Sequence, residues 1–289
     1  MTRETRVVQS RSSLRSAYAS LPPGTRRILV PTMGALHEGH ASLMRQARAM
    51  AGERGHVTSS IFVNPTQFAP HEDLDRYPRS LESDVETCAR EGVDLVFTPS
   101  VDTVYRGGDP VVTVDPGPLG TLLEGAVRPG HFRGVLTVVS KLLHLTGADV
   151  LLLGEKDYQQ LVLVKRMVFD LDLPVEVVGV PTVRADDGLA LSSRNAYLSE
   201  AERRAALAVP HALDVGHGVA ASGGSARDVV SAVQAFLDDH EDLVTDYAVV
   251  TDPGLGAPPE SGEARLILAV RVGTTRLIDN ARIDLGGAA

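Results

Sequence analysis

The segment ILVPTMGALHEGHASLMRQARAMA, residues 28–51, carries the pattern that decides the fold. It opens with a short apolar run at residues 28–30, which is typical of a buried strand. The next ten residues, PTMGALHEGH, lead out of this strand, and apolar side chains then return at helical spacing through Leu43, Met44 and Ala47. The segment therefore predicts a strand, a loop and a helix in immediate succession.

The same alternation continues along the first two thirds of the chain. Alternation of this kind implies parallel strands joined by helical crossovers. We therefore predict an α/β fold for residues 1–181, with a doubly wound, Rossmann-like parallel sheet. A run at 111–114, set among Gly and Pro, predicts one peripheral strand. The other strands are expected at 57–63, 94–98, 150–153 and 175–180, and the helices at 14–21, 81–88, 135–145 and 159–171.

The composition changes after Pro181. Ser199 and Glu202 have the spacing of a capping box, so we expect a helix to begin there, and Pro210 predicts a kink or break in it. Residues 182–289 are therefore predicted to form a second, smaller α+β domain that acts as a lid or platform. Its second helix is expected at 229–237, and its antiparallel strands at 247–251, 266–272 and 275–279.

Composition excludes several classes of protein. The 289 residues include 28 Lys and Arg against 37 Asp and Glu, and this net charge of −9 disfavours a general nucleic-acid binder. The most apolar stretch, 135–145, is too short to cross a bilayer, and the charged N-terminal segment lacks the apolar core of a signal peptide. The single cysteine, Cys88, fits a reducing compartment. We therefore expect a cytoplasmic protein with no nucleic-acid or membrane partner.

The loop PTMGALHEGH has the composition of a phosphate site. Ligands of open α/β sheets bind beyond the carboxyl ends of the strands, where this loop is expected. Gly34 and Gly39 allow a ligand close to the backbone, and the following helix directs N–H groups toward an anion. His37 and His40 can both donate to one anionic group. In the alternative interpretation, one histidine caps the helix and the other is solvated; a metal site would need a third ligand.

Two further strand ends carry polar residues. In FVNPTQF, residues 62–68, Asn64 and Gln67 offer hydrogen bonds to a small polar substrate, although Asn-Pro is also typical of a plain turn. In GEKDYQQ, residues 154–160, Lys156 can bind phosphate oxygens, and Asp157 can hold this lysine or a ribose. The alternative is that Glu155 and Asp157 only favour a helix dipole.

The loop DDGLALSSRN, residues 186–195, opens the second domain with a turn at Asp187 and Gly188. Ser192, Ser193 and Arg194 place two hydroxyls and a guanidinium together, which suits a polyphosphate, although an ordinary polar linker has the same composition. The chain contains no Gly-Lys dipeptide, so a Walker A loop is excluded. We expect the loops to converge on one triphosphate.

These segments, together with RPGHFRGVLTVV at 128–139, closely resemble the pantoate–β-alanine ligase family in their order and spacing. The family belongs to the H-x-G-H nucleotidyltransferases. The resemblance implies ATP- and Mg²⁺-dependent ligation of (R)-pantoate and β-alanine to pantothenate through a pantoyl adenylate, with release of AMP and pyrophosphate. It also implies a homodimer. Two rival hypotheses are a nucleotidyltransferase that leaves the nucleotide on its product and a nucleotide-binding sensor without catalytic activity.

The resemblance also implies roles for individual residues. The catalytic residues are His40 as proton donor, His37, Lys156, Ser192, Ser193 and Arg194. Gln67 and Gln160 bind pantoate, Gln67 also meets β-alanine, Asn64 and His131 are further substrate-binding candidates, and Asp84 is a candidate in the metal region. Leu191 and Thr66 depart from the family pattern, which we expect to alter packing more than chemistry. The ATP site comprises Pro31, Met33, Gly34, Ala35, Leu36, His37, Glu38, Gly39, His40, Gly154, Glu155, Lys156, Asp157, Val183, Leu191, Ser192, Ser193 and Arg194.

Overall fold

The chain divides into two units in the computed structural model, which describes residues 4–69, 72 and 74–286. Unit 1 consists of Met1–Glu155 and Gln159–Pro181, and unit 2 consists of Lys156–Tyr158 and Thr182–Ala289. The three residues 156–158 therefore belong with the C-terminal part of the chain, although unit 1 precedes and follows them in sequence. No helix among the described residues is long and apolar enough to span a membrane.

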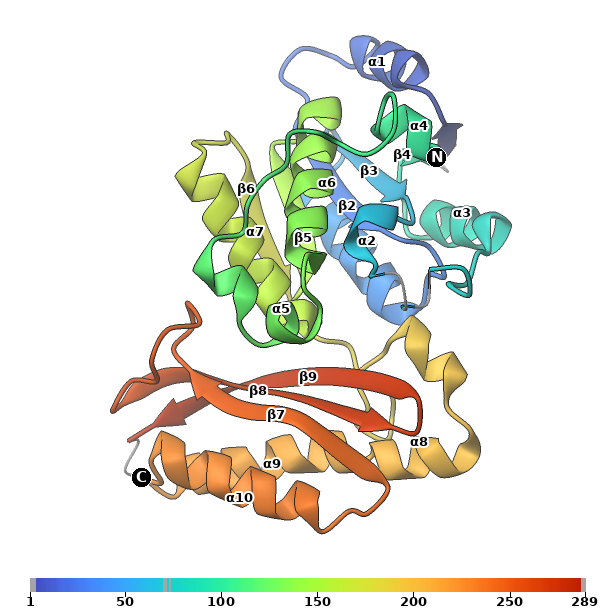
Figure 1. Ribbon diagram of the computed structural model, residues 1–289. Coiled ribbons are helices and arrows are strands. Elements are labelled where there is room, and N and C mark those ends of the chain that lie inside the picture. Colours follow the sequence, from blue (N-terminus) through green and yellow to red (C-terminus); the bar gives the residue numbers. More distant parts are fainter. Residues whose placement is uncertain (1–3, 70–71, 73, 287–289) are drawn as a thin grey trace. The chain divides into compact units, whose positions relative to one another are not determined.

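Unit 1 is built on a six-stranded sheet in the order β1-β4-β3-β2-β5-β6, and all of its strand pairs are parallel (Figure 1). The doubly wound α/β fold expected from the sequence is thus confirmed. The strands are β1 (Arg6–Val8), β2 (Arg27–Thr32), β3 (His56–Ile61), β4 (Leu95–Phe97), β5 (Val150–Gly154) and β6 (Glu176–Val180). The helices are α1 (Arg11–Ala19), α2 (Glu38–Ala51), α3 (Leu81–Arg90), α4 (Val101–Val104), α5 (Glu124–Val127), α6 (His131–Thr146) and α7 (Tyr158–Asp170).

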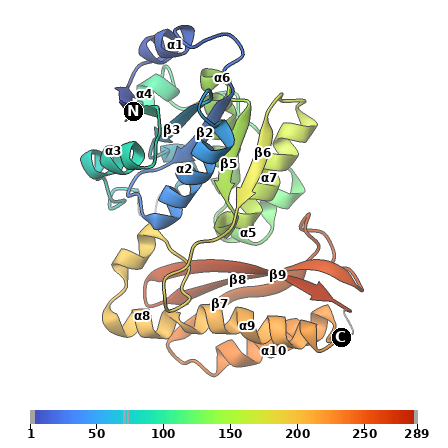
Figure 2. The same cartoon turned by 180° about the vertical axis from the view of Figure 1, so that it is seen from behind.

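Both faces of this sheet are apolar because successive side chains of a strand point to opposite sides. In β2, Ile28 and Val30 join a core with helices α2 and α3, whereas Leu29 joins the core formed with α1, α6 and α7. The two faces, with α6 on one side and α2 on the other, are seen in Figures 1 and 2. This burial on both faces explains why the strands are continuous apolar runs in the sequence.

One strand expected in unit 1 was wrong, and one observed strand was not predicted. Residues 111–114 form no strand, and Val111 and Val112 are highly exposed. The sheet is instead extended at one edge by β1, which pairs with β4 and which the sequence did not predict. An edge strand of three residues with one buried side chain carries too little periodicity to be found from its sequence.

The chain changes direction across the sheet between β2 and β5. From β2 the strands β3 and β4 follow on one side, whereas β5 and β6 follow on the other. Ligands of doubly wound sheets bind at such a switch point, beyond the carboxyl ends of the strands. The loop at 33–37 leaves β2 at this point, and the loop at 62–67 leaves the neighbouring β3.

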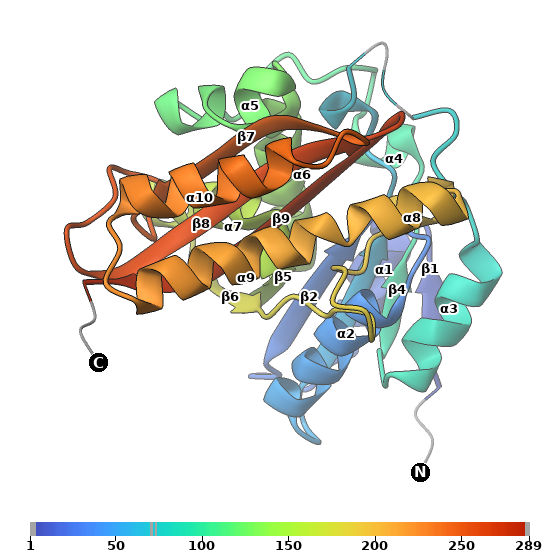
Figure 3. The same ribbon diagram turned by 90° about the horizontal axis from the view of Figure 1, so that it is seen from below.

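Unit 2 is an antiparallel sheet of three strands, β7 (Leu243–Thr251), β8 (Gly262–Val272) and β9 (Thr275–Leu285), in that order. Helices α9 (Ala208–Ala221) and α10 (Ala226–Asp238) pack on one face of it and share one core with it (Figure 3). The expected break is present, because α8 (Glu200–Ala206) ends before Leu207, its C-cap residue, and Pro210 lies in the first turn of α9. Proline is tolerated there, where its missing N–H has no helical partner.

Candidate active site

Both histidines of the H-x-G-H motif cap helix α2. His37 is the N-cap residue, and its Nδ1 accepts a hydrogen bond from the N–H of Gly39 at 3.1 Å. The Nδ1 of His40 accepts from the N–H of His37 at 3.3 Å, so two imidazoles complete a reciprocal capping box. The rings lie side by side, with centroids 4.1 Å apart.

This capping assigns the tautomer of both rings. A ring nitrogen that accepts a hydrogen bond carries no proton, so the neutral imidazole has its proton on Nε2. Each of His37 and His40 therefore presents an Nε2–H at the amino end of α2. The sequence left helix capping and phosphate donation as alternatives, but the geometry makes them compatible, because the two functions use different nitrogens of the same ring.

Asn64 is buried, with 1% of its surface exposed, and its amide is occupied by protein partners. Its Oδ1 accepts from the hydroxyl of Tyr105 at 2.8 Å and from the N–H and hydroxyl of Thr66 at 3.3 and 3.0 Å. Its Nδ2 donates to Gln67 Oε1 at 3.1 Å and to the carbonyl of Gly134 at 3.2 Å. These partners occupy both atoms of the amide and make Asn64 a residue that orients its neighbours, and its expected contact with substrate stays a prediction.

Gln67 is oriented by this network. Its Oε1 accepts from Asn64, which leaves Nε2 as the donor, and Nε2 lies 3.0 Å from the Sδ of Met33. A thioether is a weak acceptor, so an oxygen of a ligand is a better partner for this N–H. Thr66 was expected to alter packing more than chemistry, and its hydroxyl also takes part in the polar network with Asn64 and Tyr105.

His131 begins helix α6 and holds the backbone of Gln67. Arg128 Nη1 lies 3.1 Å from His131 Nε2, and because arginine only donates, this nitrogen accepts and Nδ1 carries the proton. Nδ1–H donates to the carbonyl of Gln67 at 2.8 Å. Burial, with the charge of Arg128, lowers the pKa of His131 to about 4, so the ring is neutral at pH 7. Both ring nitrogens are engaged within the protein, and the expected contact of His131 with substrate stays a prediction.

Arg128 also pairs with Glu72, with nitrogen–oxygen distances of 2.7 and 2.6 Å. The sequence analysis quoted the block that contains Arg128 but selected only His131 from it. The sequence analysis did not find Glu72 and Tyr105, because their partners Arg128 and Asn64 lie tens of residues away in the chain. A Cβ on Gly134 would collide with the carbonyl oxygen of Thr66, so this glycine allows α6 to pack directly on the loop.

Three other predicted residues of unit 1 lie outside the hydrogen-bond network of Asn64, Gln67 and His131. Glu38 is exposed and pairs with Arg45, and Gln160 is half-buried in the first turn of α7. Asp84 is buried, and its carboxylate accepts hydrogen bonds from the backbone of Ala35 and Leu36. The described residues contain no group of three or more His, Cys, Asp or Glu side chains that could hold a metal ion.

In unit 2, Lys156 is held through its backbone. Its carbonyl accepts from Asn280 Nδ2, in strand β9, at 3.0 Å, and its Nζ lies 3.9 Å from Asp157. Two residues on, the ring of Tyr158 lies under the guanidinium of Arg265, 4.0 Å from its centroid. These contacts explain why residues 156–158 belong to unit 2.

The second predicted loop of unit 2 is a turn followed by a 3₁₀-helix. The backbone of Leu191 bonds to that of Val183 at 3.0 Å, and Gly188 has φ +87°, as the expected turn requires. Ser192 caps the 3₁₀-helix Ser193–Tyr197, and its hydroxyl accepts from the N–H of Arg194 at 3.3 Å. The hydroxyls and guanidinium of residues 192–194 are therefore presented at the start of a helical turn.

A doubly wound sheet with a histidine-capped helix at its switch point defines a class of α/β enzymes that bind a phosphate-bearing ligand at the carboxyl edge. A family model, described as pantoate-beta-alanine ligase, matches residues 6–282. The chain belongs to the pantoate–β-alanine ligase family. It is a ligase that joins pantoate to β-alanine at the expense of ATP.

Curated relatives and solved structures agree with this assignment. The chain is 57% identical over 265 residues to a pantothenate synthetase from a Nocardioides species, which covers 89% of this chain and 79% of the relative. The chain is 54% identical over 282 residues to the pantothenate synthetase of Salinispora arenicola, and the match covers 97% of this chain and 98% of the relative. The pantothenate synthetase of Thermus thermophilus superposes with a TM-score of 0.88 and 47% identity, covering 96% and 98% of the chains.

A structure with bound ligands is also similar. The pantoate-beta-alanine ligase of Francisella tularensis, solved in complex with beta-gamma ATP and β-alanine, gives a TM-score of 0.79 at 34% identity and covers 96% of this chain and 97% of its own.

Proposed function

We propose that this chain forms pantothenate in two steps through a pantoyl adenylate. The carboxylate of (R)-pantoate attacks the α-phosphorus of ATP, and pyrophosphate leaves. The amine of β-alanine then attacks the acyl carbon, and AMP leaves. Adenylation itself activates the acyl group, so the protein needs no nucleophile of its own and contributes orientation and charge stabilisation.

The observation that carries this proposal is the pair of capping imidazoles. His37 and His40 present Nε2–H groups at the positive end of the α2 dipole, and a triphosphate accumulates negative charge as pyrophosphate leaves. We assign both to phosphate oxygens, with His40 as the proton donor. In unit 2, Lys156, Ser192, Ser193 and Arg194 are assigned to phosphate oxygens as well. The remaining ATP contacts are assigned to the loop from Pro31 and to Gly154–Asp157, Val183 and Leu191.

Gln67 and Gln160 are the proposed contacts to pantoate, and Gln67 also meets β-alanine. The support for Gln67 is its fixed amide, whose Nε2–H lies against the weak sulfur acceptor of Met33. Asn64 and His131 act through Gln67: the first holds its side chain and the second its carbonyl. A ligand hydroxyl or carboxylate that displaces the thioether would gain a stronger hydrogen bond.

Mg²⁺ is proposed to enter with the nucleotide. Magnesium in nucleotide sites is held by phosphates and waters with one or two carboxylates. Its chemistry would be to neutralise charge on the leaving pyrophosphate. A cytoplasmic location is proposed as well, and the buried free thiol of Cys88 is compatible with it.

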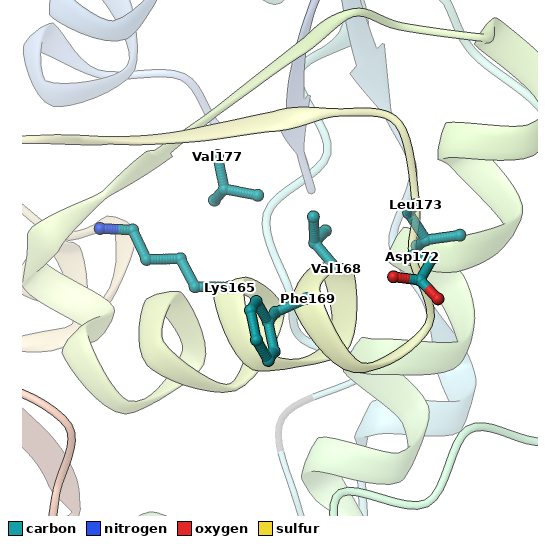
Figure 4. Close-up of a pocket in the computed structure, with 6 residues that line it drawn as sticks. All are labelled: Lys165, Val168, Phe169, Asp172, Leu173 and Val177. Carbon is teal, nitrogen blue, oxygen red and sulfur yellow. The ribbon is translucent and has the colours of Figure 1, made fainter.

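A homodimer is proposed through the free edge of unit 1. Strand β6 ends the sheet, and Phe169 beside it has 73% of its surface exposed. Phe169 lines an open pocket of about 430 Å³ together with Lys165 and Asp172, and Figure 4 shows these side chains. A two-fold interface brings one surface against itself, and a patch with both charge signs around an apolar centre is complementary to its own copy. Phe169→Glu should therefore give monomers in light scattering after gel filtration, whereas Val244→Glu, at an exposed site of unit 2, should not.

The decisive assay for the two-step reaction is exchange of labelled pyrophosphate into ATP with β-alanine absent. Exchange that depends on pantoate is expected, because the adenylate forms before the amine is needed. Absence of exchange in an enzyme that still makes pantothenate would refute the adenylate route. Free AMP and an amide product would also exclude a nucleotidyltransferase that retains the nucleotide on its product.

A further inference from the structure

The loop that precedes His37 closes around a buried carboxylate. Asp84, the fourth residue of α3, has 2% of its surface exposed. Its Oδ2 accepts from the N–H of Ala35 at 3.0 Å, and its Oδ1 accepts from the N–H of Leu36 at 2.8 Å. The hydroxyl of Ser80 donates to Oδ1 at 3.1 Å. One side chain therefore binds two successive backbone N–H groups of the loop.

The backbone of this loop is in a conformation that the chain does not favour. Gly34 has φ +86° and Ala35 has φ +51°, and an alanine in the left-handed region is strained. Two successive N–H groups that point to one side form a nest, a concavity that binds anions. A Cβ on Gly34 would lie 2.9 Å from Asp84 Oδ2, so the carboxylate fills the nest tightly. The strained conformation is thus held by the anion inside it.

We propose that Asp84 is a positioning residue for the two histidines: it occupies the nest as an internal anion, fixes the loop at 34–36, and so sets where His37 and His40 present their Nε2–H groups. This inference rests on the proposed role of those histidines at the phosphates. The ATP phosphates are then bound at the histidines and the start of α2, because the N–H groups of Ala35 and Leu36 already have their acceptor. Asp84 acts as an anchor of the loop and not as a metal ligand.

The isosteric variant Asp84→Asn tests this proposal, because an amide has one acceptor oxygen and presents an NH₂ to the second backbone N–H. The matched control is Asp94→Asn, since Asp94 Oδ2 also accepts a backbone N–H, that of Val57 at 2.8 Å, but at the amino end of β3. Hydrogen–deuterium exchange of the 33–40 peptide reports the loop, and pyrophosphate exchange gives kcat and KM for ATP and for pantoate.

In Asp84→Asn, the amides of Ala35 and Leu36 should exchange faster, and kcat/KM for ATP should fall about tenfold to a hundredfold, as for other misplaced catalytic groups. The KM for pantoate and the Mg²⁺ concentration for half-maximal rate should stay within about twofold, as should all constants of Asp94→Asn. If Asp84→Asn does not fold, Ser80→Ala removes one hydrogen bond from the carboxylate and should show the same changes at a few-fold size.

If hydrogen–deuterium exchange of the 33–40 peptide is unchanged in Asp84→Asn and the Mg²⁺ requirement is raised, Asp84 is a metal ligand and the proposal is overturned. An unchanged kcat/KM for ATP despite faster hydrogen–deuterium exchange of the loop would also overturn it, because the loop would then not determine the positions of the two histidines. Failure of the proposed function would be seen in a different measurement, because the wild-type protein itself would then show no pantoate-dependent exchange of pyrophosphate into ATP.

Discussion

His40 performs two functions with two different atoms, and substitutions can separate them. Its Nδ1 accepts from the N–H of His37 and closes the capping box, while its Nε2–H is the proposed donor to phosphate. Loss of a capping acceptor costs about 1 kcal/mol of unfolding free energy. Loss of one transition-state donor costs about 10²- to 10³-fold in kcat. His40→Ala should show both losses.

The variant that separates the two losses is His40→Gln. Glutamine at the third helical position reaches back to the N-cap N–H in ordinary capping boxes, so it replaces the Nδ1 contact but not the imidazole donor. Urea unfolding should place His40→Gln within about 0.5 kcal/mol of wild type, with His40→Ala lower by about 1 kcal/mol. Pyrophosphate exchange should fall by about 10² or more in both variants.

Two results would refute this reasoning. A His40→Gln enzyme with nearly normal turnover would show that the imidazole donates nothing to the reaction. If the activity of His40→Gln exceeded that of His40→Ala only as far as its stability does, the histidine would matter only as a helix cap. His37→Asn is the parallel control at the neighbouring ring, because asparagine is a preferred N-cap residue and retains the acceptor for Gly39.

Three further outcomes are expected. Tyr105→Phe removes a hydroxyl bonded to Asn64, so the KM for pantoate should rise about three- to tenfold at constant KM for ATP; equal changes in both would contradict the role of Asn64 in orienting Gln67. The pKa of His131, lowered to about 4 by burial, means that the unfolded chain binds one more proton between pH 4 and 6.5. Stability should therefore fall by about 3 kcal/mol as the pH drops through this window, and urea unfolding of His131→Gln should lack that component. Asn280→Ala loses the hydrogen bond to the carbonyl of Lys156 and should lower kcat about tenfold with less effect than Lys156→Ala; an unchanged kcat would show that this anchor does not matter.

The motifs supplied the candidate site residues but not the hydrogen bonds that these residues make within the protein. Asn64 was expected at the substrate because its polar side chain follows a strand, and His131 because the family resemblance implies it. The structure shows that every hydrogen-bonding atom of both side chains is occupied within the protein. A sequence shows which groups are available but not whether a distant Tyr105 or Arg128 already binds them.

The sequence by itself determined the doubly wound sheet. Strands that are buried on both faces leave unbroken apolar runs, and these runs alternate with helical patterns along the chain. The sequence also placed the loops after β2 and β3 at one edge, since parallel strands end on the same side. Tertiary structure alone decided that Asp84 anchors the loop before His37, that β1 extends the sheet, and that residues 156–158 join unit 2. Hydrogen bonds between residues tens of positions apart leave no periodic signal in the chain, so only the folded backbone brings their atoms within about 3 Å of one another.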